Sequence, residues 1–152
     1  MPNWCNNRLA VYGPEQDVKR FKEQAVGDSP WDKEEKSNIW DQEKPNALNF
    51  HSLVPIPKSV LAEGYEKAGY NWEKANWGCK WGACHAELVD EWEGHLSYAF
   101  DTAWSPPMKF LERLGPQWPT LIFLLDYEEM GMGFKGICKA KGDVVEDHCV
   151  TL

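Results

Sequence analysis

Residues 6–17 read Asn-Asn-Arg-Leu-Ala-Val-Tyr-Gly-Pro-Glu-Gln-Asp, and this stretch decides how the fold begins. Residues 8–12 alternate in polarity with a period of two, which predicts a strand with one buried face. Gly13-Pro14 ends that strand, and a proline suits the first turn of a helix because its missing N–H costs nothing there. A helix is predicted from Glu15 onward, since four apolar side chains fall on one side of it: Val18, Phe21, Ala25 and Val26.

The middle of the chain predicts a second strand and two helices. Residues 47–54 supply the apolar residues of a strand that Pro55-Ile56-Pro57 ends, and a short helix is expected over 59–63. Residues 70–81 fit a helix, with Trp77 and Trp81 one turn apart on the same face. Two apolar faces on this helix indicate burial on more than one side.

The second half of the chain predicts five strands and one helix. Residues 84–92 and 96–100 form a hairpin about Glu93-Gly94. A helix follows Ser105-Pro106-Pro107, with Ser105 as its cap, and Gly115-Pro116 ends it. The apolar run over 120–127 predicts a central strand covered on both faces, and strands are expected over 134–139 and 144–150.

This order of elements predicts an α+β fold with one antiparallel or mixed sheet and helices on one face. We expect a single domain over 1–152, because its 152 residues suffice for one core and show no internal repeat. Residues 27–45 form an acidic loop excursion that Trp31 and Trp40 anchor, and residues 58–82 form a helical insertion.

Composition excludes several classes of function. The formal net charge of −8 opposes binding to duplex nucleic acid, which requires Lys and Arg on the phosphates. No apolar run is long enough to cross a membrane, and residues 1–4 lack the features of a signal peptide. Five cysteines, an odd number without close pairs, argue against a disulfide framework. We therefore expect a soluble, cytoplasmic protein with reduced thiols.

Three short stretches mix tryptophan with amide and charged side chains: 3–7, 76–81 and 100–105. Trp has a large apolar ring and an N–H donor, so nine of them must either be satisfied in the core or present ring faces to a ligand. Stacking rings, amides that read base edges, and ammonium groups for a phosphate together suggest a nucleotide-type site. Its predicted members are Asn3, Trp4, Asn6, Asn7, Asn76, Trp77, Lys80, Trp81, Asp101, Trp104 and Lys135.

The same three stretches, with the later 127–129 and 133–136, resemble the YubB-type family of plasmid and phage proteins. This resemblance covers nearly the whole chain and implies a ferredoxin-like domain and a mobile-element origin. The family has no settled activity, so the resemblance supplies no catalytic mechanism. The family's central motif more usually has Thr before the lysine and an acidic residue or Asn after the second tryptophan. Cys79 and Gly82 stand at those places here, which puts any contact made by the usual side chains in doubt.

The sequence supports a catalytic site less well than a binding site. Cys79, Cys84, His85 and His148-Cys149 lack the spacing of a zinc site. Cys79 lies beside Lys80 but has no defined histidine partner, as a nucleophile needs. The carboxylates of Asp101 and Asp126 would have to converge for acid–base work, and strand-end solvation is the simpler interpretation. We predict no cofactor and no metal.

The sequence thus predicts a binding protein without covalent chemistry, which sequesters a small nucleotide-type signal to counter a host defence. An alternative is an acidic protein–protein inhibitor that covers a basic surface of a host nuclease or nucleic-acid-binding protein. A hydrolase that acts on the bound nucleotide and a pocket shared between subunits of a homo-oligomer both remain open.

Overall fold

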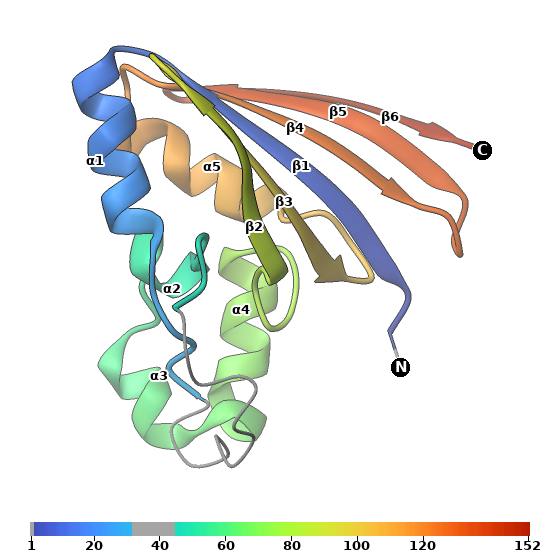
Figure 1. Cartoon of the computed structure of the whole chain (residues 1–152). Coiled ribbons are helices and arrows are strands. Elements are labelled where there is room, and N and C mark those ends of the chain that lie inside the picture. Colours follow the sequence, from blue (N-terminus) through green and yellow to red (C-terminus); the bar gives the residue numbers. More distant parts are fainter. Residues whose placement is uncertain (1, 32–44) are drawn as a thin grey trace.

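A computed structural model describes residues 2–31 and 45–152 and shows six strands with helices on one side of them (Figure 1). The strands are β1 (Trp4–Tyr12), β2 (Cys84–Trp92), β3 (His95–Ala103), β4 (Ile122–Glu129), β5 (Phe134–Lys141) and β6 (Val144–Thr151). The helical elements are α1 (Glu15–Ala25), α2 (Phe50–Leu53), α3 (Lys58–Glu63), the π-helical turn η1 (Tyr65–Gly69), α4 (Tyr70–Asn76) and α5 (Met108–Gln117).

The six strands form one sheet in the order β2-β3-β1-β4-β5-β6, and every neighbouring pair is antiparallel. The first four strands of this order, with α1 and α5, make a ferredoxin-like unit. The hairpin β5–β6 extends the sheet beyond β4. The helical elements α2 to α4 lie between α1 and β2, and we call them the insertion, which begins earlier and ends earlier than the predicted insertion of residues 58–82. The predicted α+β class and the placement of helices on one face are confirmed, and the sheet is antiparallel rather than mixed.

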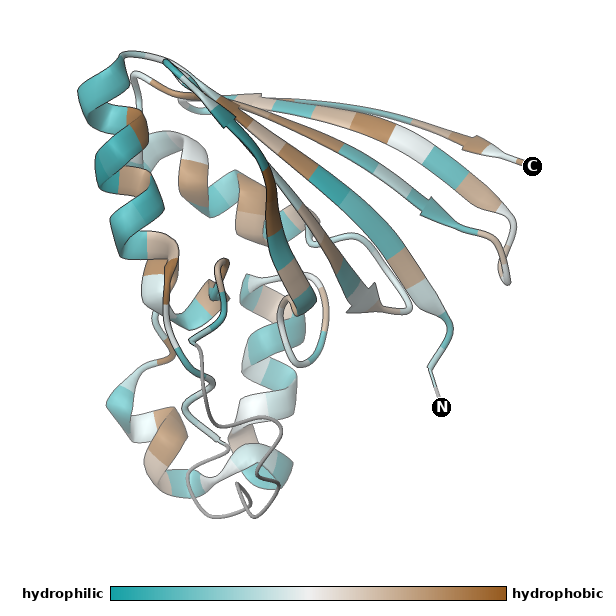
Figure 2. Ribbon diagram, in the orientation of Figure 1, coloured by the Kyte–Doolittle hydropathy of each residue, from teal (hydrophilic) through white to brown (hydrophobic). Residues whose placement is uncertain are grey.

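The core lies between the inner face of the sheet and the helices. Leu9 and Val11 on β1 are fully buried, whereas Arg8 and Tyr12 point to the outer face, as the two-residue period predicts. The helices α1 and α5 turn their hydrophobic residues toward the sheet (Figure 2). Phe50 from α2 stacks on Phe110 from α5, with 3.8 Å between ring centroids, so the insertion is joined to the core.

Four local predictions are wrong. Residues 47–54 contain the short helix α2 (Phe50–Leu53) instead of a strand, and Asn49 caps this helix by accepting a hydrogen bond from Ser52 N–H. The helix predicted over 70–81 ends at Asn76. Ser105 is not the cap of α5, since its hydroxyl donates to the Gly78 carbonyl at 2.7 Å, and α5 continues through Gly115 and Pro116 to Gln117.

The outer face of β4 is also open, contrary to prediction. Asp126 is exposed there, while Ile122 and Leu124 are half-buried. No described element packs on this side of the sheet, which the insertion does not reach (Figure 1). Residues 32–44, which include Trp40 and most of the predicted acidic excursion, lie outside the described residues. Within the described residues, no helix is both long and apolar enough to cross a membrane.

We expect the substitution Phe110→Ala to lower the free energy of unfolding by about 3–5 kcal/mol, since it removes a buried ring and leaves a cavity beside Phe50. Urea denaturation followed by circular dichroism measures the change. The control Met130→Ala alters an exposed side chain and should shift the free energy by less than about 0.5 kcal/mol. Equal effects of the two substitutions would contradict the packing described here.

Candidate functional site

A cavity of about 820 Å³ lies between the insertion, the segment 29–31 and the start of β2, and we call it the insertion cleft. Its volume is within the range of small-molecule sites. Five aromatic residues line it: Trp31, Phe50, Tyr65, Trp77 and Trp81. Walls of this kind offer apolar area and flat ring faces, which suit a planar organic ligand.

Trp81 stands at this cleft in a strained conformation. Its backbone φ is +71°, a left-handed value that bulky residues rarely adopt, and the residue is 44% exposed. The Lys80 ammonium lies 4.1 Å from the centroid of this ring, which is a cation–π distance. Strain that surrounding contacts maintain, on an exposed ring, is typical of functional sites.

Glu73 supplies the contacts that hold Trp81. This carboxylate on α4 is completely buried, and its Oε1 accepts a hydrogen bond from the backbone N–H of Trp81 at 2.7 Å. Its Oε2 accepts from the Trp31 indole N–H at 2.9 Å. Burial raises the pKa of Glu73, although these two hydrogen bonds act to lower it. One side chain therefore ties α4, the 29–31 segment and the Trp81 loop together.

Trp77 forms a wall of the cleft and offers no exposed stacking face. It is 2% exposed, and its indole N–H donates to the Val54 carbonyl at 3.1 Å. Its ring packs nearly at right angles to Phe50 and Trp72. Because α4 ends at Asn76, Trp77 and Trp81 do not share one helical face as predicted.

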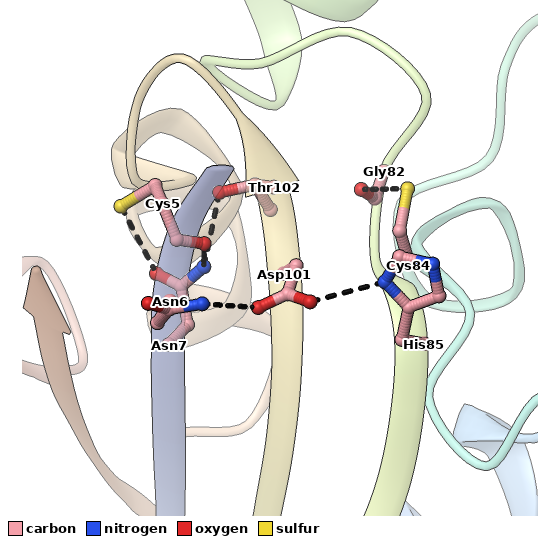
Figure 3. A network of polar contacts seen from close by, with 8 residues as sticks. All are labelled: Cys5, Asn6, Asn7, Gly82, Cys84, His85, Asp101 and Thr102. Atoms are coloured by element: carbon pink, nitrogen blue, oxygen red, sulfur yellow. Dashed lines mark hydrogen bonds and ion pairs between the residues drawn. The ribbon is translucent and has the colours of Figure 1, made fainter. Parts of the chain in front are cut away.

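A polar network joins the ends of three strands beside the cleft (Figure 3). Asp101 on β3 lies at its centre: Oδ1 accepts from Asn6 Nδ2 at 2.7 Å, and Oδ2 lies 3.0 Å from His85 Nδ1. Asn7, by contrast, points inward and is buried, where its Nδ2 donates to Thr102 Oγ1 at 3.0 Å. Asn6 is thus an exposed member of the network, Asp101 is half-buried, and Asn7 is structural.

His85 connects this network to the cleft. It lines the cleft together with Trp81, and its ring packs edge-on against Trp4 at 5.3 Å between centroids. The Trp4 ring in turn lies 6.4 Å from that of Trp81. Trp4, Trp81 and His85 therefore form one aromatic corner, although they come from β1, a loop and β2.

The other predicted site residues lie elsewhere. Asn76 is tied to the helices, since it donates to the Trp72 carbonyl and accepts from Arg113. Trp104 is 47% exposed and donates its backbone N–H to the Asn3 carbonyl at the ends of β1 and β3. Lys135 lies 3.7 Å from Glu128 on the outer sheet face, beside a second hollow of about 480 Å³ that Asn6, Asn7 and Asp101 also line.

The sequence did not identify Glu73, Tyr65 or His85 as site residues. A signal for Glu73 was present, because it precedes Trp77 and Trp81 at the same four-residue spacing and so interrupts an apolar stripe. The sequence suggested His85 only as a metal ligand and gave no signal for its contact with Asp101, since the pairing of β2 with β3 is irregular at this point.

The structure also bears on two catalytic interpretations of the sequence, a metal site and a cysteine nucleophile. In residues 2–31 and 45–152, no group of three or more His, Cys, Asp or Glu side chains is arranged to hold a metal ion. Cys79 is buried, and burial raises the pKa of its thiol well above the usual value. A thiolate nucleophile at Cys79 is therefore disfavoured.

The raised pKa of Glu73 predicts a specific pH dependence of stability. The folded protein keeps the Glu73 proton to a higher pH than the unfolded chain does. In the pH range from the ordinary pKa of 4.5 up to the raised pKa, the folded state therefore binds more protons than the unfolded state. We expect the free energy of unfolding of the wild type, minus that of Glu73→Gln, to fall as pH rises through this range. Urea denaturation at a series of pH values measures it, and a difference that rises with pH would contradict the burial effect.

Comparisons with known proteins agree with the architecture. No curated protein matches the chain. A crystal structure of a protein api92 from Yersinia pseudotuberculosis is similar, with a TM-score of 0.75 at 10% sequence identity, over 100% of this chain and 99% of the other. At such low identity the similarity shows the fold alone. Residues 76–150, just under half of the chain, match the family model described as a ferredoxin-like domain in Api92-like protein.

Proposed function

We propose that this protein binds a small nucleotide-type ligand in the insertion cleft, with the planar base against Trp81, and that it sequesters this ligand without changing it covalently. The observation that carries the proposal is the strained, exposed ring of Trp81 at a cavity of about 820 Å³. The hydrogen bond to Glu73 maintains this backbone conformation, while the side chain stays accessible. A ring fixed in place before binding stacks on a base with little loss of conformational entropy.

Charge suggests how such a ligand would be oriented. Glu66 and Glu73 line the cleft, and no Lys or Arg is found among its described lining residues. Acidic walls oppose the entry of a phosphate group, whereas they accept a neutral base. Lys80 is not a lining residue, but its ammonium lies over the ring of Trp81, which is one, and so it supplies a cation for the phosphate beside the cleft. The base therefore enters the cleft and the phosphate stays outside.

The resemblance to plasmid and phage proteins supports a biological context for this binding. A mobile element in a host cytoplasm gains from removing a nucleotide signal on which host defence depends. Sequestration requires affinity and abundance only, so it needs no catalytic group at the site. We therefore propose a counter-defence role for the protein.

Trp81→Ala should weaken nucleotide binding by roughly 5- to 100-fold, because base–aromatic stacking contributes about 1–3 kcal/mol per base. Calorimetry with the linear and cyclic monophosphates of the four common nucleosides measures the change. Trp92→Ala is the matched control, since Trp92 is 56% exposed at the opposite end of the sheet and should bind as the wild type does.

Two results would contradict the proposal. One is the absence of binding heat with every nucleotide of the panel, together with an unchanged melting temperature. The other is conversion of the bound nucleotide, which chromatography of the ligand recovered after denaturing the complex would detect. Intact recovery is expected of a protein that only sequesters.

A further inference from the structure

We infer that His85 is a ligand-binding residue whose Nε2 atom accepts a hydrogen bond from the base, and that the site therefore selects a nucleobase with an exocyclic amino group. This inference rests on the proposed function, because it concerns the same cleft. It adds His85, which does not stack on the base, and it assigns the contact to one atom of this residue, Nε2. It also names the chemical group of the ligand that this atom recognises.

The neighbours of His85 orient its ring and select its tautomer. Asp101 Oδ2 lies 3.0 Å from Nδ1, and Asp101 is itself fixed by the hydrogen bond from Asn6 at 2.7 Å. A carboxylate accepts and does not donate, so Nδ1 carries the proton in the neutral ring. Nε2 is then left with a free lone pair. The network therefore leaves a single, oriented acceptor for another molecule.

The backbone at His85 shows that this orientation is a built feature of the site. Its φ of +55° lies in the left-handed region, and the register of β2 against β3 is irregular between Cys84 and Glu87. Bulges of this kind redirect side chains and are common beside active sites. Among the described residues other than glycine, Trp81, His85 and Trp104 alone have positive φ values. Two of these three line the cleft.

The position of His85 suits contact with a ring that stacks on Trp81. Both side chains border the same cleft, and the Trp4 ring packs against both of them. The His85 side chain is 65% exposed, so its free edge is accessible to a ligand. A base that lies flat against Trp81 presents its edge sideways, and the edge carries its amino group. Nε2 is the acceptor that such a group requires.

His85→Asn isolates the proposed atom. Asparagine tolerates left-handed backbone conformations, and its amide nitrogen can replace Nδ1 as the donor to Asp101. The substitution removes Nε2 while it keeps the fold and the network, which a urea denaturation curve checks. A second variant, Asp101→Asn, keeps the imidazole and removes the carboxylate that selects its tautomer.

The test is calorimetry with paired nucleosides: adenosine with purine riboside, guanosine with inosine, and cytidine with its analogue that lacks the amino group. We expect the amino-bearing member that binds to lose roughly tenfold in affinity on His85→Asn, the equivalent of one good hydrogen bond. Its partner should bind equally weakly to both proteins.

Three outcomes would overturn the inference. Equal binding by wild type and His85→Asn would show that Nε2 contacts nothing. Equal losses for both members of a pair would show that His85 only shapes the cleft. In these two cases the dependence on Trp81 would survive, so the proposed function would stand. Absence of binding by every nucleoside and nucleotide would reject the inference and the proposed function together.

Discussion

The buried carboxylate of Glu73 is the constraint on which the candidate site depends. A carboxylate without solvent contact is costly unless donors surround it, and Glu73 has two of them, from Trp31 and Trp81. Their positions follow from that requirement. The 29–31 segment is held to α4, and the Trp81 backbone is held in a left-handed conformation that it would otherwise avoid. The shape of the cleft is therefore a consequence of satisfying one charge.

The ferredoxin-like unit and the insertion have different tasks in this account. The antiparallel sheet brings the ends of β1, β2 and β3 together, and so it sets Asn6, His85 and Asp101 within hydrogen-bonding distance. The insertion supplies two of the aromatic wall residues, Phe50 and Tyr65, and the Glu73 anchor. Phe50 stacked on Phe110 joins the two parts, which gives the cleft a rigid base. Rigid support of this kind keeps a recognition site in its binding geometry.

Much of the fold followed from the sequence, since strands with one buried face show a two-residue period. The hairpin about Glu93-Gly94 was predicted correctly, and Gly94 has the positive φ that such a turn needs. The strand predicted over 47–54 failed because its four large apolar residues fit a buried helical turn equally well, and only the Asn49 cap decided between them. Short apolar runs are ambiguous in this way.

The site was predictable only in part. Trp4, Asn6, Trp81 and Asp101 do meet, because polar residues beside tryptophans cluster where strands end. Trp77 was misjudged, since its exposure depends on where α4 ends, and tertiary contacts set that point. His85 was missed because a bulge in β2, which local sequence does not specify, directs its ring. The sequence predicted a surface that mixes tryptophan with amide and charged side chains, and the sheet topology determines which of these residues lie together.

The most direct test of the central claim is a nuclear magnetic resonance titration of the nine indole N–H signals of ¹⁵N-labelled protein with AMP, CMP, GMP and UMP. If Trp81 is the stacking surface of a nucleotide site, its indole signal should shift with at least one nucleotide, while that of Trp92 stays in place. Shifts confined to Trp92 or Trp104, or no shift of any indole at saturating nucleotide, would contradict the account.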